Sequence, residues 1–203
     1  MEHGPKQELE QRLGLVGSED TLRGLFFNSV LEQVRPLQNP AAWRRCVEAA
    51  GGERFMAFFS YPISAYLRLL YTAAEALSEG RGELGMALWH LGRELVPHYL
   101  DSSAGQVLLL MSQGKPRRLL EGLPPAYRTA IRHGQCSVEW LGPCHGRLLF
   151  QGCTLPAEFY EGAVRGVFET TRLTHATIQA RQVDLLSTEV EVKWGQERDE
   201  TGR

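Results

Sequence analysis

The spacing of the apolar residues changes abruptly near residue 135 of this 203-residue chain. Before that point, apolar side chains recur every three or four positions, as they do along one face of an α-helix. Beyond it, short runs alternate apolar and polar residues, which predicts strands with one buried face. The sequence therefore indicates a helical layer followed by a sheet.

Five amphipathic helices are expected in the first two thirds of the chain, over residues 22–34, 40–50, 62–77, 83–99 and 103–113. The helix after Asn39 has a typical start, because an asparagine cap precedes a proline at the first helical position. The next segment, 115–132, contains three prolines and is expected to form short helical turns. Residues 1–20 are polar and are expected to be a loosely ordered arm or one short helix.

The last third of the chain predicts two hairpins that flank a single helix. Alternation is clearest at 136–140 and 190–194, where Val138, Trp140, Val190, Val192 and Trp194 are expected on the buried face. The helix between the hairpins carries Gly162 and Gly166 one turn apart. Because a glycine inside a helix costs about 1 kcal/mol relative to alanine, we expect both glycines to let the helix lie close on the sheet. A groove for a ligand or a partner's backbone is the alternative.

The predicted fold class is α+β, with an amino-terminal helical layer followed by a four-stranded antiparallel β-β-α-β-β unit. Residues 21–194 are expected to form a single domain, between the arm at 1–20 and a disordered, charged tail at 195–203. A chain of this length can bury about 70% of its unfolded surface, so it needs neither a disulfide nor a metal ion to fold.

Composition excludes several classes of protein. The net charge of −2 gives no general attraction to nucleic acid. The longest apolar runs are far shorter than the roughly 20 residues that cross a bilayer, and the first residues do not form a signal peptide, so a cytoplasmic location is expected. The four cysteines lack CxxC spacing and are expected to be free thiols.

Short motifs along the chain resemble a myxobacterial family of roughly 200-residue proteins of unknown function. The resemblance runs from about residue 20 to residue 194, and it implies a fold and a lineage but no activity. It is carried by Gly24-Leu25-Phe26-Phe27, Tyr61-Pro62, Leu91-Gly92-Arg93 through Tyr99 and Gly105, Gly114-Lys115-Pro116-Arg117-Arg118, Tyr127-Arg128-Thr129, Glu158-Phe159-Tyr160-Glu161-Gly162 and Val192-Lys193-Trp194.

More distantly, helices followed by strand-strand-helix-strand-strand are similar to the fold of haem nitric-oxide-binding sensors, 4-vinyl-reductase-like domains and transport-protein-particle subunits. This resemblance implies binding of small or greasy ligands, or assembly with partners, by analogy of fold alone. The haem sensors' Tyr-x-Ser-x-Arg signature is absent, because residues 132–137 read Arg-His-Gly-Gln-Cys-Ser. No haem and no other cofactor is therefore expected.

No metal or catalytic site is expected from the sequence. Cys144 falls at a hairpin tip, about 25 Å from Cys136 and Cys153 at the open end, so one ion cannot reach both ends. His90 and Glu94 lie on one side of the same predicted helix and could handle a proton or share an ion. A solvated polar face is the simpler interpretation, but these two residues are the best candidates for an enzyme or a metal sensor.

Basic residues gather in the segment 115–132. Arg117, Arg118 and Arg128 lie there among apolar side chains and Tyr127, and arginine suits the bidentate capture of a carboxylate or a phosphate. A solvated rim is the alternative. The predicted binding residues are these three arginines, Tyr127 and the glycines Gly162 and Gly166.

We therefore expect a non-enzymatic regulatory or scaffold module. It would bind a hydrophobic or acidic small molecule, or a protein partner, between its helical layer and its sheet. The basis is an abundance of aromatic and aliphatic side chains without a positioned nucleophile or base. A purely structural homo-oligomer, such as a homodimer, that buries Phe58, Phe59 and a sheet edge against a second copy is one alternative. An enzyme or metal sensor that uses His90 and Glu94 is another.

Overall fold

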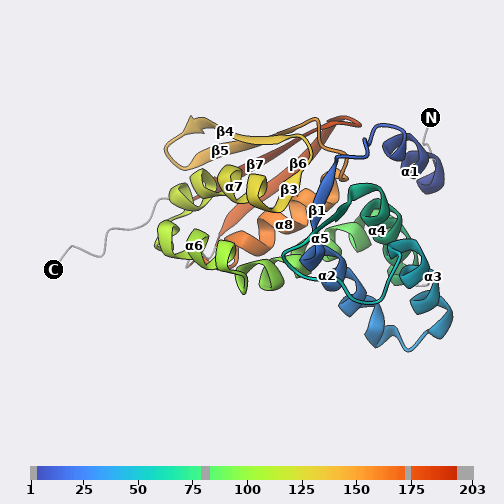
Figure 1. Cartoon of the computed structure of the whole chain (residues 1–203). Coiled ribbons are helices and arrows are strands. Elements are labelled where there is room, and N and C mark those ends of the chain that lie inside the picture. Colours follow the sequence, from blue (N-terminus) through green and yellow to red (C-terminus); the bar gives the residue numbers. More distant parts are fainter. Residues whose placement is uncertain (1–3, 79–82, 172–174, 196–203) are drawn as a thin grey trace.

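The computed structural model describes residues 4–78, 83–171 and 175–195 (Figure 1). Its helices are α1 (Pro5–Leu13), α2 (Gly24–Val34), the 3-10 turn η1 (Arg35–Leu37), α3 (Pro40–Ala50), α4 (Ile63–Ser78), α5 (Leu84–Leu100), α6 (Ser103–Ser112), α7 (Pro116–Ala130) and α8 (Ala157–Phe168). Its strands are β1 (Thr21–Arg23), β2 (Ser60–Pro62), β3 (Ile131–Arg132), β4 (Gln135–Gly142), β5 (His145–Gln151), β6 (Ala176–Asp184) and β7 (Ser187–Trp194). The predicted tail lies, apart from Gly195, outside the described residues.

The main sheet has the strand order β4-β5-β7-β6, and every neighbouring pair is antiparallel. Helix α8 connects the two hairpins, which confirms the predicted α+β class with its β-β-α-β-β unit. Val138, Leu148, Val190 and Ala180 stand side by side across the four strands. Leu148 and Val190 are completely buried, so this row lies on the inner face of the sheet.

A second, three-stranded sheet with the order β2-β1-β3 joins the amino-terminal half to the end of α7. The sequence does not predict this sheet. Its strands have only two or three residues, too few to show alternation, and β1 pairs with β3 across more than 100 positions of sequence, from Leu22 to Ile131.

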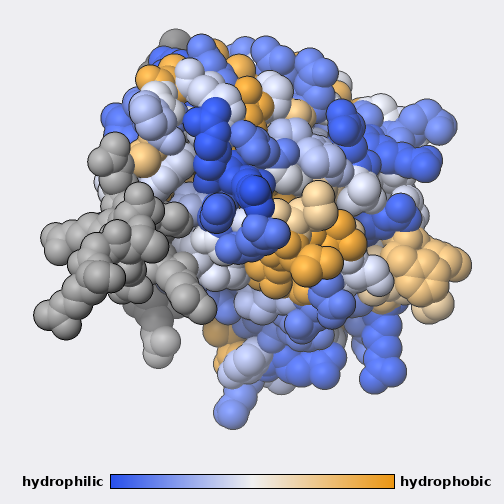
Figure 2. Space-filling model, turned by 90° about the vertical axis from the view of Figure 1, so that its left-hand side faces the viewer, coloured by the Kyte–Doolittle hydropathy of each residue, from blue (hydrophilic) through white to orange (hydrophobic). Residues whose placement is uncertain are grey.

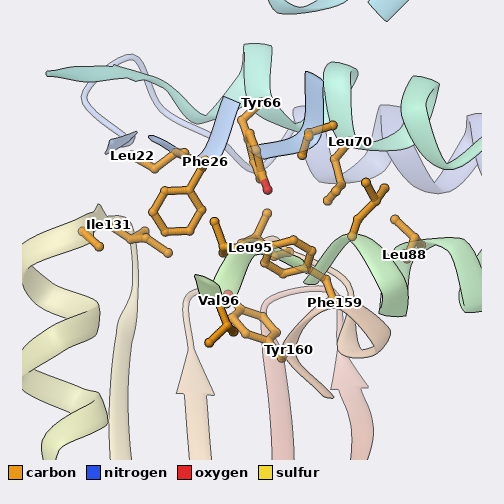
Figure 3. Packing of buried hydrophobic residues seen from close by; sticks show 14 of the residues in the cluster. Leu22, Phe26, Tyr66, Leu70, Leu88, Leu95, Val96, Ile131, Phe159 and Tyr160 are labelled. Atoms are coloured by element: carbon orange, nitrogen blue, oxygen red, sulfur yellow. The ribbon is translucent and has the colours of Figure 1, made fainter. Parts of the chain in front are cut away.

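The helices form layers on the inner face of the main sheet (Figure 1). Helices α7 and α8 contact the sheet, α5 packs on α8, and α2 and α4 pack on α5. Figure 3 shows how the side chains meet between these layers: Phe26 and Tyr66 point from the amino-terminal helices toward Leu95 on α5 and Phe159 on α8. One continuous core therefore links the helical layer to the sheet.

The outer face of the sheet is polar, as alternation predicts. Arg147 on β5 lies 3.4 Å from a carboxylate oxygen of Glu139 on β4 and 3.9 Å from one of Glu189 on β7. These cross-strand pairs are partly exposed to solvent and contribute little to stability. Within the part of the chain that the structure describes, no helix is both long and apolar enough to cross a membrane.

Helix α7 corrects one sequence-based expectation. Residues 116–130 form one helix, although Pro124 and Pro125 stand inside it and each removes a backbone donor. Leu119 and Leu120 are buried on its inner face and Leu123 packs beside them. Burial of this stripe stabilises the helix by more than its prolines destabilise it, because packing rather than intrinsic propensity supplies most helical stability in proteins.

Within the predicted arm, α1 is held by a buried arginine. Arg12 is 1% exposed and donates to the carboxylate of Glu8 and to the backbone oxygens of Thr154 and Leu185. Glu8 also accepts a hydrogen bond from the Tyr71 hydroxyl on α4. Helix α1 thus bridges the amino-terminal helices and the loops beside the sheet. The division of the chain into an arm at 1–20 and one domain at 21–194 stays a prediction.

Glycines set the distance between α5 and α8. A β-carbon on Gly162 would lie 1.9 Å from the carbonyl oxygen of Trp89, and one on Gly92 would lie 2.1 Å from that of Phe159. At Gly166 the nearest backbone atom is the carbonyl oxygen of Arg93, at 2.8 Å. The predicted close approach is real, but its partner is helix α5 and not the sheet.

Replacement of Gly162 by alanine should push α5 and α8 apart, because the new methyl group meets backbone atoms that cannot rotate away. We expect the free energy of unfolding, measured by urea denaturation, to fall by roughly 2–3 kcal/mol or more. Gly195→Ala is the matched control, since nothing lies within 4 Å of that position, and it should change stability by less than about 0.5 kcal/mol. Equal stability of the two variants would contradict the helix contact.

Candidate functional site

A cavity of about 110 Å³ lies between α5, α7 and α8 and the inner face of the β4–β5 hairpin. It is therefore situated between the helical layer and the sheet. The surrounding side chains are almost entirely apolar or aromatic. They are Phe26, Leu95, Val96, Tyr99, Leu123, Ala126, Tyr127, Ala130, Ile131, Cys136, Phe150, Phe159, Tyr160, Ala163, Val164 and Val167.

Small side chains leave the space open. Ala126 and Ala130 lie one turn apart on α7, and Ala163 lies on α8, so three facing positions carry only a methyl group. On the sheet side, the rings of Phe150 and Tyr160 stack with centroids 4.0 Å apart and nearly parallel planes. Alanines at inward-facing positions are the sequence signal for this cavity, and they belong to no catalytic motif.

Hydroxyl and thiol groups line one edge of the cavity. The Tyr127 hydroxyl donates to the backbone oxygen of His133 at 2.9 Å and lies 3.1 Å from the sulfur of Cys153. The hydroxyls of Tyr99 and Tyr160 are buried without a hydrogen bond of normal geometry among the described residues. The cavity is thus apolar with a few polar atoms at its margin, as is usual for small-molecule sites.

Burial keeps the titratable groups around the cavity uncharged. It raises the pKa of the Cys136 thiol to about 12 and holds the pKa values of Tyr127 and Tyr160 well above their usual range. Burial also raises the pKa of Cys153. At neutral pH these four groups carry no charge, so the cavity suits a neutral molecule.

The structure separates the predicted binding residues into three places. Tyr127 lines the cavity, whereas Gly162 and Gly166 face α5 at the helix contact. The three arginines are exposed on α7 and none of them lines the cavity. The guanidinium carbon of Arg117 lies 4.0 Å from the ring centroid of Trp140 on β4, and Arg117 also pairs with Glu121, while Arg118 hydrogen-bonds to Gln113. The three arginines therefore do not share a site with Tyr127.

His90 and Glu94 also lie away from the cavity. His90 is exposed on α5, and the Glu94 carboxylate pairs with Arg93 at 2.6 Å. His98, the next residue along the same side of the helix, lies 3.7 Å from the carboxylate of Glu32. Among the described residues, no group of three or more histidine, cysteine or acidic side chains is placed to hold a metal ion.

The four thiols should differ in reactivity. Burial raises the pKa of Cys46 to about 11 and that of Cys136 to about 12, and it also protects Cys153, whereas Cys144 lies half-buried in the β4–β5 turn. Because the thiolate is the reactive form, the folded protein at pH 8 should react with Ellman's reagent at Cys144 first, and all four thiols should react after unfolding in urea. Cys144→Ser should remove the fast phase, and a fast phase that survives in this variant would contradict the prediction.

Solved structures with the same arrangement of elements are H-NOX proteins. The Fe(II) unliganded H-NOX protein from K. algicida shares 13% sequence identity and superimposes with a TM-score of 0.60, covering 87% of this chain and 98% of its own. The H-NOX protein from S. oneidensis in the Fe(II)NO ligation state shares 11% identity with a TM-score of 0.57, covering 86% and 100%. The similarity to the fold of haem sensors is confirmed, and at these identities it concerns the fold alone.

The residues around the cavity do not fit haem. None of the described side chains that line it is a histidine, and the thiol and phenol groups that could bind iron are kept protonated by burial. The volume of about 110 Å³ is well below the roughly 300 Å³ at which pockets for drug-sized ligands begin. A macrocycle could enter only if the side chains and helices around the cavity moved apart.

A family profile matches the sequence along most of its length. It covers residues 16–195, which include every strand and every helix from α2 to α8 and therefore the whole wall of the cavity. No curated protein matches the sequence. The predicted resemblance to a family of about 200-residue proteins of unknown function is thus confirmed. The chain belongs to the family described as "Protein of unknown function (DUF2378)".

Proposed function

We propose that the protein is a non-enzymatic ligand-binding module whose cavity holds a small, neutral, mainly apolar molecule. The cavity between α5, α7, α8 and the sheet is the observation that carries this proposal. It adjoins the continuous core of buried side chains, and three alanines keep it open. Cavities with apolar walls take up apolar guests.

The volume limits the size of the ligand. An engineered apolar cavity of about 150 Å³ binds benzene or xenon, so about 110 Å³ suits a single ring or a short alkyl group. The buried hydroxyls of Tyr99 and Tyr160 would offer a hydrogen bond to one polar atom of such a molecule. Ligand binding by a sensor is also consistent with the likeness to H-NOX proteins.

None of the described side chains that line the cavity is charged, which favours binding over catalysis. General acid–base chemistry needs a group that titrates near the working pH, and burial keeps Cys136, Tyr127 and Tyr160 protonated. His90 and Glu94 belong to the exposed surface of α5, with Glu94 paired to Arg93. These observations support a binding module in preference to the enzyme alternative.

Benzene and xenon are suitable probes of the cavity. Benzene should raise the melting temperature of the protein, because it binds only the folded state. Ala163→Leu should abolish this rise by filling the space, whereas Ala65→Leu, a half-buried alanine on α4 away from the cavity, should leave it unchanged. NMR shifts of ¹²⁹Xe would give an independent measurement. No stabilisation of the wild-type protein, or equal stabilisation of the Ala163→Leu variant, would refute the proposal.

Haem and zinc should be absent from the purified protein. The cavity side chains do not fit haem, and the described residues hold no cluster of metal ligands. Titration with haemin should therefore give no saturable Soret band at one haem per chain, and elemental analysis should find far less than one zinc per chain. A stoichiometric Soret band would show that the cavity opens widely enough for a macrocycle.

A further inference from the structure

Helix α6 exposes a row of large apolar side chains. Val107 is 57% exposed, Leu110 76% and Met111 68%, although helix faces in a soluble domain normally bury such residues. Figure 2 shows this apolar patch facing the viewer with hydrophilic side chains around it. Rimmed apolar patches of this type mark interaction sites.

The patch is one wall of a groove. Between α6 and α7 lies an open groove of about 950 Å³, with Leu108 at its base and Pro125 and Ala126 on the opposite wall. Gly122 leaves room for the end of the Leu108 side chain, because a β-carbon there would lie 2.4 Å from a methyl carbon of Leu108. A groove between two helices that has an apolar floor is shaped to receive a third helix.

Two charged side chains, Arg118 and Glu121, line the groove itself, and an excess of positive charge lies on α7 beside it. Helix α6 carries no charged residue, whereas the stretch from Lys115 to Ala130 contains Lys115, Arg117, Arg118 and Arg128 against only Glu121. Glu121 is already paired with Arg117 at 3.3 Å. Within residues 4–78, 83–171 and 175–195, neither Lys115 nor Arg128 has an ion-pair partner. The basic flank is thus largely uncompensated.

We propose that the α6–α7 groove docks an amphipathic helix of a protein partner, with apolar residues on one face and acidic residues beside them. The apolar stripe would cover Val107, Leu110 and Met111, and the acidic residues would lie along Arg118 and Arg128. A second copy of this chain fits less well, because α6 has no acidic residue that could face the basic α7 of another copy. A flat bilayer fits less well too, because the apolar surface is concave.

Fluorescein-labelled synthetic helices of about five turns test this proposal by fluorescence anisotropy. One peptide has leucine and methionine on one face and glutamate elsewhere, a second has lysine in place of every glutamate, and a third is a scramble of the first. The full-length protein should bind the acidic amphipathic peptide, and higher salt should weaken binding. The lysine and scrambled peptides should bind at least about tenfold more weakly.

Protein variants locate the binding. Leu110→Ser with Met111→Ser should weaken binding of the acidic peptide by about tenfold or more, and so should Arg118→Glu with Arg128→Glu. The matched controls are Phe58→Ser with Phe59→Ser, which removes another exposed apolar pair, and Arg44→Glu with Arg68→Glu on α3 and α4. Both controls should bind like wild type. All the changed side chains are exposed, and circular dichroism verifies that each variant is folded.

Four results would overturn the proposal. The first is that the acidic peptide does not bind up to millimolar concentration, and the second is that the acidic and lysine peptides bind equally well. The third is that the groove variants bind the acidic peptide like wild type. The fourth is that the groove is found to bind a second copy or a membrane instead. Sedimentation that finds a dimer dissolved by Leu110→Ser with Met111→Ser would assign the groove to a second copy. Binding to phosphatidylglycerol vesicles that is lost in that variant would assign it to a membrane. The benzene experiment probes the cavity separately and does not depend on these outcomes.

Discussion

The structure depends on the contact between the backbones of α5 and α8. At Gly92 and Gly162 a single methyl group would overlap a carbonyl oxygen of the facing helix, so the two helices lie as close as their backbones permit. Helix α8 also packs on β6 and β7, while α5 packs on α2 and α4. The contact therefore joins the sheet to the amino-terminal helices and sets the distance between the two halves of the core. Phe159, beside the contact, reaches Tyr66 with ring centroids 6.2 Å apart.

This close contact also explains where the cavity lies. Residues of α8 alternate between two directions: Gly162 and Gly166 face α5, and Ala163 and Val167 face the space beneath α7. One side of α8 packs tightly on α5, and α7 covers the other side. The residues of α7 that face α8 include Ala126 and Ala130, whose small side chains leave the cavity open. Helix α7 has a further role, since Ala126 lines both the cavity and the α6–α7 groove. One helix is therefore the shared wall of an interior space and an exposed apolar surface.

The comparison with H-NOX proteins shows that a shared fold can enclose different cavities. The arrangement of helices and strands is shared over nearly the full length of those structures, yet this cavity is far smaller than a macrocycle needs and its groups are neutral. A fold specifies where a cavity forms, between the helices and the sheet. The side chains that point into it decide what it can hold, and here they leave room for little more than a ring.

Local pattern determined most of the helices and the strands of the main sheet. Alternation at 136–140 and 190–194 predicts strands with one wet face, and the caps and apolar stripes predict α2 to α6, because these signals arise from neighbouring residues. Tertiary structure decided everything that depends on residues distant in sequence. Helix α7 continues past Pro124 and Pro125 because its leucines are buried. The short strands β1 and β3 form only because they pair across the chain. Gly162 predicts a close contact on one face of its helix. Only the tertiary structure shows that α5, and not the sheet, makes this contact, because sequence spacing specifies a face of a helix and not what lies against that face.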